Sequence, residues 1–163
     1  MITIGLFGTC GGSQWRTPFK LAYEKNEIAY FDPQVDDWTP ELAVEEARHL
    51  AEDRIILFPV LGETYGTGSL AETGFSILQA IRLDSRRDFV LLIEPKIDDK
   101  LTENLVAAKE STRSRALVLS HLRRINFENV YIVDNLDDML NLSMLLYEIA
   151  VRREAISRFS AAR

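Results

Sequence analysis

The sequence predicts an α/β protein, a three-layer sandwich in which a five-stranded parallel β-sheet carries helices on both faces. Two observations support this prediction. Short apolar runs rich in β-branched residues alternate along the chain with longer segments of helical pattern. One run, "RIILFPV" at 54–60, is apolar on both faces, as expected of a central strand. Strands and helices that alternate in this way form parallel sheets between layers of helices.

Each predicted element has a local signal. Gly8 ends the first apolar run, and Asp32-Pro33 closes the second. Thr39-Pro40-Glu41 marks a helix start, with proline at the first helical position. The expected strands are 2–7, 28–31, 54–60, 89–95 and 129–135. The expected helices are 14–25, 40–52, 70–82, 101–124 and 136–158. With no repeat, low-complexity tract or linker, residues 1–163 are expected to form a single domain.

Composition narrows the classes of function. The net charge is −6, and no basic block interleaved with aromatic residues is present, so we expect no polymeric nucleic acid as partner. A single nucleotide remains possible as a ligand. The single cysteine, Cys10, excludes an internal disulfide and cannot by itself form a metal site. No apolar run approaches the roughly 18 residues of a membrane span, and the N-terminus lacks a signal-peptide pattern. We expect a cytoplasmic protein that contacts no membrane and needs neither metal nor cofactor.

The richest glycine and polar content follows the first three predicted strands, in "GTCGGSQWR", "DPQVDDW" and "LGETYGTGSLAE". In parallel sheets, ligands bind beyond the carboxyl ends of the strands. These loops therefore predict a small ligand that spans all three, with Gly8 and Gly12 of the first loop among its contacts.

Several known motifs compete at these loops. Gly66-x-Gly68-x-x-Ala71 matches the dinucleotide-binding fingerprint, but it follows the third strand, whereas that fingerprint belongs after the first. A phosphate-accepting receiver domain needs a lysine at the end of the fifth strand, where this chain has "VDNLDD". Neither histidine falls in a strand-end loop to partner Cys10, so that cysteine is expected to be a small apolar filler.

Glu72 lies among small residues in "GTGSLAETGF". Ser69-Leu70-Ala71-Glu72 has the spacing of a capping box, in which Ser69 would begin a helix and Glu72 would close it. Gly74 in the same turns weakens the helix, which favours close approach of a ligand to the backbone. Thr67 and the start of this helix would add hydrogen-bond donors for such a ligand.

Taken in order, "LFGTCGGSQWR", "AYFDPQVDDW", "EEARHLAEDRIILFPV" and "GTGSLAETGF" resemble the nucleoside 2-deoxyribosyltransferase-like superfamily. Its relatives include the 2′-deoxynucleoside 5′-phosphate N-hydrolases. The resemblance covers residues 2 to about 95. It implies a flavodoxin-like or Rossmann-like fold and cleavage of an N-glycosidic bond of a nucleoside or nucleotide. It also implies that Glu72 is the nucleophile and that an acidic residue on the preceding helix, Glu45 or Glu46, assists.

Helical spacing favours Glu46 over Glu45. The apolar stripe of 40–51 contains Leu42, Ala43, Ala47 and Leu50, and Glu46 lies at its edge. Glu45 points away from that stripe, beside Arg48. A carboxylate that borders the core is the better candidate for a perturbed pKa.

The resemblance implies covalent catalysis, in which a carboxylate attacks the anomeric carbon as the base leaves. As the first-turn residue of its helix, Glu72 would be kept ionised by the positive helix N-terminus. Trp15 is a candidate to stack on a base, Arg16 to hold a phosphate and Asp32 to bind base or sugar edges. Thr67, Gly68 and Ser69 complete the predicted contacts.

The chain departs from the family at two positions. The family often carries an acidic residue or serine six positions before the nucleophile, where this chain has Gly66, and an aromatic hydroxyl in the first loop, where it has Phe7 and Gly8. These departures favour an alternative, a non-catalytic nucleotide-binding or interaction module on the same fold.

Two further expectations concern the second half of the chain. The last predicted helix, with "MLNLSMLLYEIAV", is apolar over more of its circumference than one sheet face needs, which predicts a homo-oligomer. The run "ESTRSRALVLSHLRR" carries four arginines and is expected to be a solvated helix face.

Overall fold

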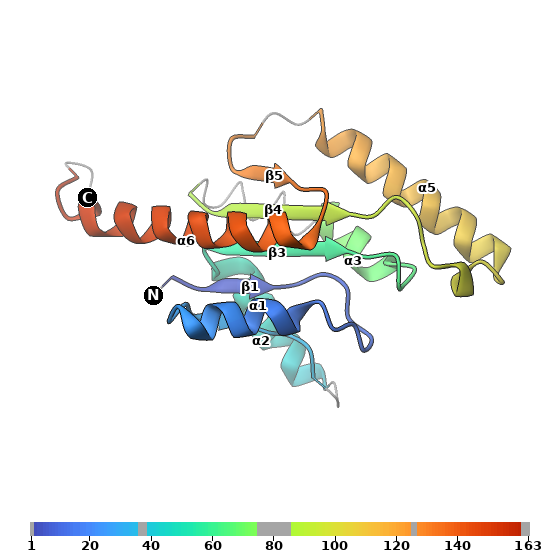
Figure 1. The fold of residues 1–163 in the computed structure, drawn as a ribbon, viewed down its shortest axis with the longest axis horizontal. Helices are drawn as coiled ribbons and strands as arrows, with labels where there is room; N and C mark the ends of the chain where they lie inside the picture. The colour runs from blue at the N-terminus through green and yellow to red at the C-terminus, as the bar shows by residue number, and fades with distance from the viewer. Residues whose placement is uncertain (1, 36–38, 75–85, 125–126, 161–163) are drawn as a thin grey trace.

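The computed structural model describes residues 2–35, 39–74, 86–124 and 127–160, and in these ranges it forms one sheet between two layers of helices (Figure 1). The five strands are all parallel, in the order β2-β1-β3-β4-β5. The strands are β1 (Ile4–Leu6), β2 (Tyr30–Phe31), β3 (Ile55–Val60), β4 (Asp88–Ile93) and β5 (Val130–Ile132). The described helices are α1 (Arg16–Lys25), α2 (Pro40–Glu52), α3 (Thr67–Glu72), α5 (Leu105–Leu122) and α6 (Leu136–Ser157), with a short 3-10 helix η2 (Asp99–Leu101). The predicted fold class is confirmed.

Strand β3 lies in the middle of the sheet, as its apolar run predicts. Every residue of Ile55–Val60 is buried. Because successive side chains of a strand point to opposite faces, Ile55 and Leu57 enter one core while Ile56 and Phe58 enter the other. A strand that is apolar on both faces therefore has helices to bury it on both sides.

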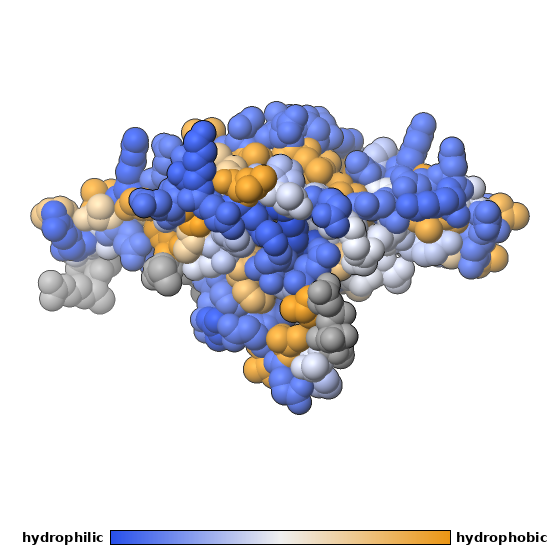
Figure 2. All heavy atoms as spheres, turned by 60° about the horizontal axis from the view of Figure 1, so that its bottom comes forward, coloured by the Kyte–Doolittle hydropathy of each residue, from blue (hydrophilic) through white to orange (hydrophobic). Residues whose placement is uncertain are grey.

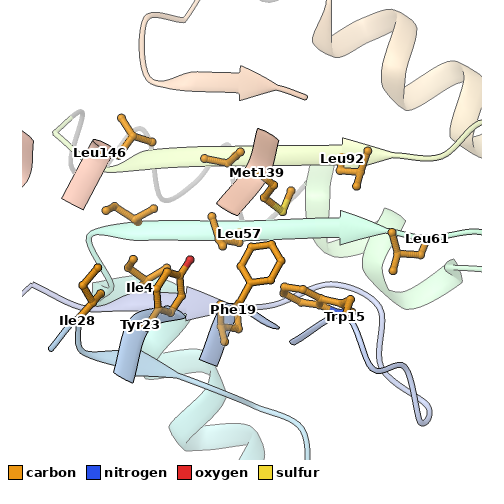
Figure 3. Close-up of a cluster of buried hydrophobic side chains, with 13 residues drawn as sticks. Ile4, Trp15, Phe19, Tyr23, Ile28, Leu57, Leu61, Leu92, Met139 and Leu146 are labelled. Atoms are coloured by element: carbon orange, nitrogen blue, oxygen red, sulfur yellow. The ribbon is translucent and has the colours of Figure 1, made fainter. Parts of the chain in front are cut away.

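Helices α1 and α6 cover the first face. Phe19 and Tyr23 of α1 pack with Met139 and Leu146 of α6 over the sheet, as Figure 3 shows. The Tyr23 hydroxyl lies 2.6 Å from the Ser143 hydroxyl of α6, so the polar atom of the buried tyrosine is satisfied. This hydrogen bond joins the two helices across 120 residues of sequence.

The opposite face is covered by α2, α3 and α5. Leu50, Leu70 and Leu122, one from each helix, pack against the sheet side chains on this side. Those sheet side chains are Phe7, Ile56, Phe58, Val60, Phe89, Leu91 and Ile93. Helices α2 and α3 carry the two candidate carboxylates, so this layer supports the site.

Most predicted elements are present, with shorter bounds. The fourth predicted helix begins at Leu105 rather than at 101 because the side-chain oxygen of Asn104 accepts a hydrogen bond from the Ala107 amide at 3.1 Å. Asn135 caps α6 in the same way through the Asp138 amide, at 2.8 Å. Of the predicted helix 70–82, residues 75–82 lie outside the described residues. No helix in the described ranges has the length and apolar character that a membrane span requires.

Candidate functional site

A cleft of about 380 Å³ lies where the loops after β1, β2 and β3 meet helices α2 and α3. The cleft opens beyond the carboxyl ends of the strands, where parallel sheets bind ligands. Its lining residues are Gly8, Cys10, Gly11, Pro33, Glu46, Thr64, Gly66, Thr67, Gly68, Ser69 and Glu72. Of the residues predicted from the sequence, the cleft brings together both carboxylates, Gly8 and the Thr67–Ser69 segment.

Glu46 and Glu72 face the same cleft, and the charge of Glu46 affects the ionisation of Glu72. Burial raises the pKa of Glu46, and the charge of Arg16 opposes part of that rise. Burial also raises the pKa of Glu72, and the negative charge of Glu46 raises it further. Glu72 remains accessible to solvent as a residue, so a ligand can reach its carboxylate. Two carboxyl groups with raised pKa values in one cleft are a common basis for acid–base and nucleophilic chemistry.

The structure places Glu46, and not Glu45, in the cleft. Glu45 lies exposed on α2, where its carboxylate accepts a hydrogen bond from Arg48 Nε at 3.1 Å. That ion pair lowers the pKa of Glu45. The amphipathic stripe of the helix therefore distinguishes two adjacent glutamates that the order of residues alone leaves equivalent.

The predicted capping box of Ser69 and Glu72 is wrong. Helix α3 begins three residues earlier, with Gly66 as its N-cap in a left-handed conformation, φ 67°. The Leu70 amide donates to the Gly66 carbonyl at 2.8 Å, so Ser69 lies within the first turn. Glu72 consequently lies in the second turn, and its pKa is raised by its surroundings instead of being lowered by the helix N-terminus.

The space and the backbone conformation at position 66 explain why this chain has a glycine there, where the family that it resembles often has an acidic residue or serine. A Cβ at Gly66 would lie 2.7 Å from Val60 Cγ1 and 3.0 Å from Arg115 Nη2, both side chains of the protein. The positive φ adds backbone strain for any other residue. Phe7, at the other departure, is buried and stacks on Phe58 at a centroid distance of 6.3 Å, so it does not face the cleft.

The glycines of the loops serve different purposes. A Cβ at Gly8 would lie 2.4 Å from the Pro59 carbonyl oxygen, so this glycine lets the first loop cross β3. A Cβ added at Gly11 or at Gly68 would meet no described atom within 4 Å apart from its neighbours along the chain, and both glycines line the cleft. Gly12 is exposed and does not line the cleft, contrary to its predicted contact. A Cβ added at Gly74 would also meet no such atom within 4 Å, so packing does not explain why this position is a glycine.

Trp15 and Arg16, which were predicted to contact a ligand, are buried and do not line the cleft. The Trp15 ring packs edge-on against Phe19 with centroids 5.1 Å apart, and its indole nitrogen donates to the Thr9 carbonyl at 2.9 Å. Arg16 donates to the Leu6 carbonyl at 2.9 Å and to the Thr9 carbonyl at 2.7 Å. Both side chains support the first loop from inside the protein. Neither the indole ring nor the guanidinium is exposed for stacking or for a phosphate.

Asp32 is likewise committed to protein groups. Its carboxylate lies 3.2 Å from Arg16 Nε and 3.0 Å from Lys20 Nζ, and it accepts a hydrogen bond from the Gln34 amide at 3.0 Å. The neighbouring Pro33, and not Asp32, lines the cleft. The carboxylate of Asp32, which was predicted to bind a base or sugar, thus forms ion pairs that fix the second loop.

Cys10 is exposed at the cleft instead of filling a core gap, which corrects the prediction made for it. Its thiol donates to the Gly8 carbonyl at 3.4 Å. Sequence reasoning also missed Gly11, Pro33 and Thr64 as lining residues. All three lie in the glycine-rich and polar loops that the sequence indicated. The sequence therefore predicted which loops form the cleft, but not which of their residues line it.

Two hydrogen-bonded connections join the first loop to the third. The Thr9 hydroxyl donates to the Pro59 carbonyl at 3.1 Å and accepts from the Leu61 amide at 2.8 Å. Ser13 donates to the carboxylate of Glu63. The walls of the cleft are thus fixed to each other before any ligand binds, which is the condition for preorganised binding.

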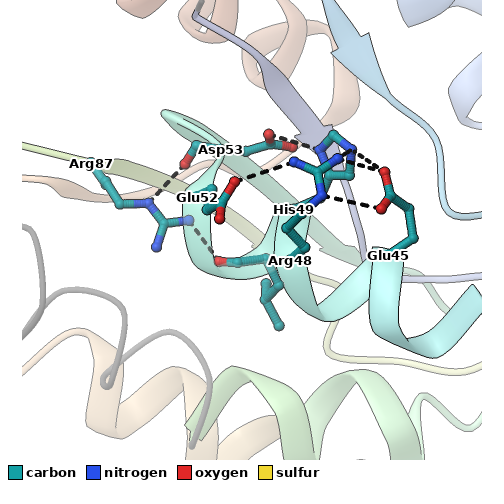
Figure 4. A network of polar contacts seen from close by, with 7 residues as sticks. Glu45, Arg48, His49, Glu52, Asp53 and Arg87 are labelled. Carbon is teal, nitrogen blue, oxygen red and sulfur yellow. Dashed lines mark hydrogen bonds and ion pairs between the residues drawn. The ribbon is translucent and has the colours of Figure 1, made fainter.

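A polar network anchors the carboxyl-terminal half of α2 (Figure 4). His49 stacks on Phe31 with centroids 3.6 Å apart, and its Nδ1 lies 2.9 Å from the buried Asp53 carboxylate. Arg48 bridges Glu45 and Glu52. Arg87 donates to the Asp53 carbonyl at 2.7 Å. Through Leu50 and Asp53, Arg87 fixes the carboxyl-terminal end of α2 to the amino end of the sheet.

Two other hollows are larger, but neither is lined by Glu46 or Glu72. One, of about 450 Å³, lies between α3 and α5 and is lined mainly by apolar and hydroxyl-bearing side chains, with Glu110 as its single carboxylate. The other, of about 500 Å³, involves Arg54 before β3 and Arg153 of α6. Within the described ranges, no group of three or more histidine, cysteine and acidic side chains is arranged to hold a metal ion.

Comparisons with known proteins assign the chain to no family. No protein-family model matches the chain, and no curated protein matches its sequence. Among solved structures, the chain is similar to the RPS4 and RRS1 TIR domain heterodimer, with a TM-score of 0.49 and 11% identity over 94% of this chain and 96% of that chain. A likeness at this level carries no argument about function. The α/β assignment therefore rests on the strand order and layers of the chain itself.

Proposed function

We propose that this protein cleaves the N-glycosidic bond of a nucleoside through a covalent intermediate on Glu72. The observation that carries the proposal is the placement of Glu46 and Glu72 in one cleft at the carboxyl ends of the strands. Paired carboxyl groups of this kind support glycoside cleavage, in which one attacks the sugar and the other handles the proton. The sequence resemblance favours Glu72 as the attacking residue.

The reaction requires the two carboxyl groups, the substrate and an acceptor, which is water or a second base. The Glu72 carboxylate forms a bond to the anomeric carbon as the carbon–nitrogen bond breaks and its electron pair passes to the base. Glu46, when protonated, gives its proton to the departing base. The Glu46 carboxylate then takes a proton from water or a second base, which attacks the anomeric carbon, and the carbon–oxygen bond to Glu72 breaks to release it as a carboxylate. Transfer and hydrolysis share the first step and differ only in the acceptor.

The charges around the pair indicate when this step can occur. Arg16 favours ionised Glu46, and ionised Glu46 raises the pKa of Glu72. Between their two pKa values, the pair therefore holds a single proton that belongs to both residues. These charges favour the arrangement in which Glu72 carries the proton, so the attacking form, with Glu72 ionised and Glu46 protonated, is the less populated arrangement of that singly protonated state. We expect the rate to fall at low pH, where both are protonated, and at high pH, where both are ionised.

The lining of the cleft favours an uncharged nucleoside over a nucleotide. Among the described residues that line it, two are carboxylates and none carries a positive charge. The nearby cations are already engaged: Arg16 donates to loop carbonyls, and Lys20 pairs with Asp32. A phosphate group would thus approach negative charge with no partner, which weakens its binding.

The test is incubation of the protein with ribonucleosides, deoxynucleosides and their 5′-monophosphates, followed by chromatography for free base. We expect release from at least one nucleoside, faster than from the matching monophosphate. An added acceptor base distinguishes transfer from hydrolysis. Thermal stabilisation by these ligands without any base release would instead support the alternative, a non-catalytic nucleotide-binding module.

A further inference from the structure

We propose that Arg115 is a positioning residue for the cleft, because it fixes the loop between β3 and α3 that brings Glu72 to the site. Its catalytic consequence rests on the proposed function, whereas its effect on the loop does not. Arg115 belongs to the arginine-rich segment of α5 that the sequence assigns to a solvated face. The structure corrects that expectation, since Arg115 is 0% exposed.

All five N–H donors of the Arg115 guanidinium are used within the protein. Its Nη1 donates to the carbonyls of Val60 and Glu94, at 2.8 and 2.9 Å. Its Nη2 donates to the carbonyls of Leu61 and Thr64, both at 2.8 Å. The fifth donor, Nε, reaches the Ser111 hydroxyl at 3.2 Å. Four main-chain carbonyls and one hydroxyl therefore accept hydrogen bonds from the guanidinium, and no carboxylate among the described residues accepts one.

These carbonyls define the course of the third loop. Val60 ends β3, Leu61 and Thr64 belong to the loop, and Glu94 follows the neighbouring strand β4. Ser111, one helical turn before Arg115, donates to the Tyr65 carbonyl at 2.7 Å. One face of α5 therefore binds the loop at several successive positions and ties it to two strands.

The connection to the cleft passes through Gly66. This residue packs against the guanidinium so closely that a Cβ would lie 3.0 Å from Nη2. Gly66 is also the N-cap of α3, and the six residues of that helix end with Glu72. Thr64 and Gly66 line the cleft themselves. A shift of the loop would consequently move both the wall of the cleft and the helix that carries Glu72.

Only an arginine fits this arrangement. The planar guanidinium directs five donors along its edges and stays charged, whereas a lysine ammonium directs three donors from one point. Lysine at position 115 would keep the charge and much of the stem but could not reach carbonyls on two sides. The substitution Arg115→Lys is therefore expected to loosen the loop without removing the charge.

The test compares Arg115→Lys with Arg87→Lys as a matched control. Arg87 is also buried and also donates to main-chain carbonyls, those of Leu50 at 2.6 Å and Asp53 at 2.7 Å, but it lies at the amino end of the sheet. Amide hydrogen exchange of residues 62–72 is measured in both variants. We expect at least about tenfold faster exchange there in Arg115→Lys, and wild-type exchange in Arg87→Lys.

Two readouts then separate positioning from general stability. The pKa of Glu72, followed by carboxyl ¹³C NMR, should change in Arg115→Lys alone. With a nucleoside that releases base, kcat/KM should fall about 100-fold in Arg115→Lys, as misplacement of a reacting group implies, and less than about twofold in the control. If Arg115→Lys does not fold, Ser111→Ala is measured in its place, because it removes the contact to the Tyr65 carbonyl and keeps the arginine.

The outcomes are distinct. Equal effects of the two lysine variants on exchange, on the Glu72 pKa and on turnover would overturn the positioning role. If no nucleoside releases base even with the wild-type protein, the proposed function fails. In that case the exchange and NMR results still decide whether Arg115 holds the loop.

Discussion

At the scale of single residues, Glu72 differs from the nearby Asp32 and Glu45 in how its carboxylate is compensated. Asp32 has Arg16 and Lys20 within 3.2 Å, and Glu45 has Arg48. Glu72 has burial and another carboxylate, both of which oppose its ionisation. Groups held in this way ionise at the cost of stability, which is typical of residues retained for chemistry.

The coupling between the two glutamates can be measured directly. Glu46→Gln removes a negative charge from the cleft, so we expect the pKa of Glu72 to fall while the part of its rise due to burial remains. Carboxyl ¹³C NMR titration measures this shift. Glu45→Gln is the matched control, since its exposed carboxylate is paired with Arg48, and it should leave Glu72 unchanged. The same response in both variants would contradict the assignment of Glu46 to the cleft.

The raised pKa of Glu72 also predicts a pH-dependent stability. The folded protein holds the Glu72 proton more tightly than the unfolded chain does. That stabilisation is fully present below the unfolded pKa, about 4.3, and is lost as the pH rises through the folded value. Glu72→Gln should therefore stabilise the protein at pH 8, by at most about 1 kcal/mol because the residue remains accessible to water.

Urea unfolding at pH 8 and near pH 4 tests this expectation, since the gain should vanish at the lower pH. Glu45→Gln supplies a control of opposite sign, because Arg48 lowers the pKa of Glu45 and its ionised form stabilises the folded state. A loss of stability in Glu72→Gln at pH 8 would show that the carboxylate is satisfied by its surroundings.

The sequence predicted the two carboxylates better than the residues around them. The apolar stripe of α2 selected Glu46, because a helix face is a local property that spacing reveals. Trp15 and Arg16 were assigned to a ligand, yet both are buried beneath the first loop. Whether a long side chain is buried depends on which loop packs over it, and that contact forms only in the folded chain.

At the scale of elements, the start of α3 decides the geometry of the site. The short pattern of Ser69 and Glu72 predicts a capping box, but the left-handed Gly66 lets the helix begin at Thr67. A positive φ leaves no mark in the sequence except the glycine itself. The strands were more predictable, since the apolar run of β3 alone indicated a central position, which the strand order confirms.

Gly66→Ala is expected to destabilise the protein strongly. An alanine there would adopt a left-handed conformation and bring its Cβ to 2.7 Å from Val60, so we expect a loss of more than about 2 kcal/mol. Gly68→Ala is the matched control, two residues along the same helix. Its Cβ would meet nothing within 4 Å, and replacing a helical glycine should gain up to about 1 kcal/mol. Chemical denaturation of the pair measures both changes, and a tolerated Gly66→Ala would refute the assigned cap.

At the scale of the whole molecule, helix α6 leaves apolar side chains uncovered. Leu145, Ile149 and Ile156 are 57%, 42% and 64% exposed and recur on one stripe of the helix. Figure 2 shows apolar side chains among polar ones at the end of the molecule where α6 ends in Figure 1. Such a stripe is typical of a surface that a second copy covers.

We therefore predict a homo-oligomer that uses this face of α6. Light scattering at micromolar concentration should give a mass of at least two chains, and the double variant Leu145→Lys/Ile149→Lys should give that of one. Val44→Lys is the control, because Val44 is 73% exposed on α2, on the other side of the sheet. A wild-type monomer, or dissociation by the control, would contradict the prediction.

The central claim, that Glu72 forms a bond to the sugar, is tested most directly by trapping the intermediate. The protein is mixed with a nucleoside that releases base, quenched rapidly in acid and examined by intact-mass spectrometry with peptide mapping. The account predicts an added mass of one sugar residue on the peptide that contains Glu72, present in wild type and absent in Glu72→Gln, which should also lose at least about 1,000-fold in base release. Base release that persists in Glu72→Gln, or a sugar adduct on another residue, would contradict it.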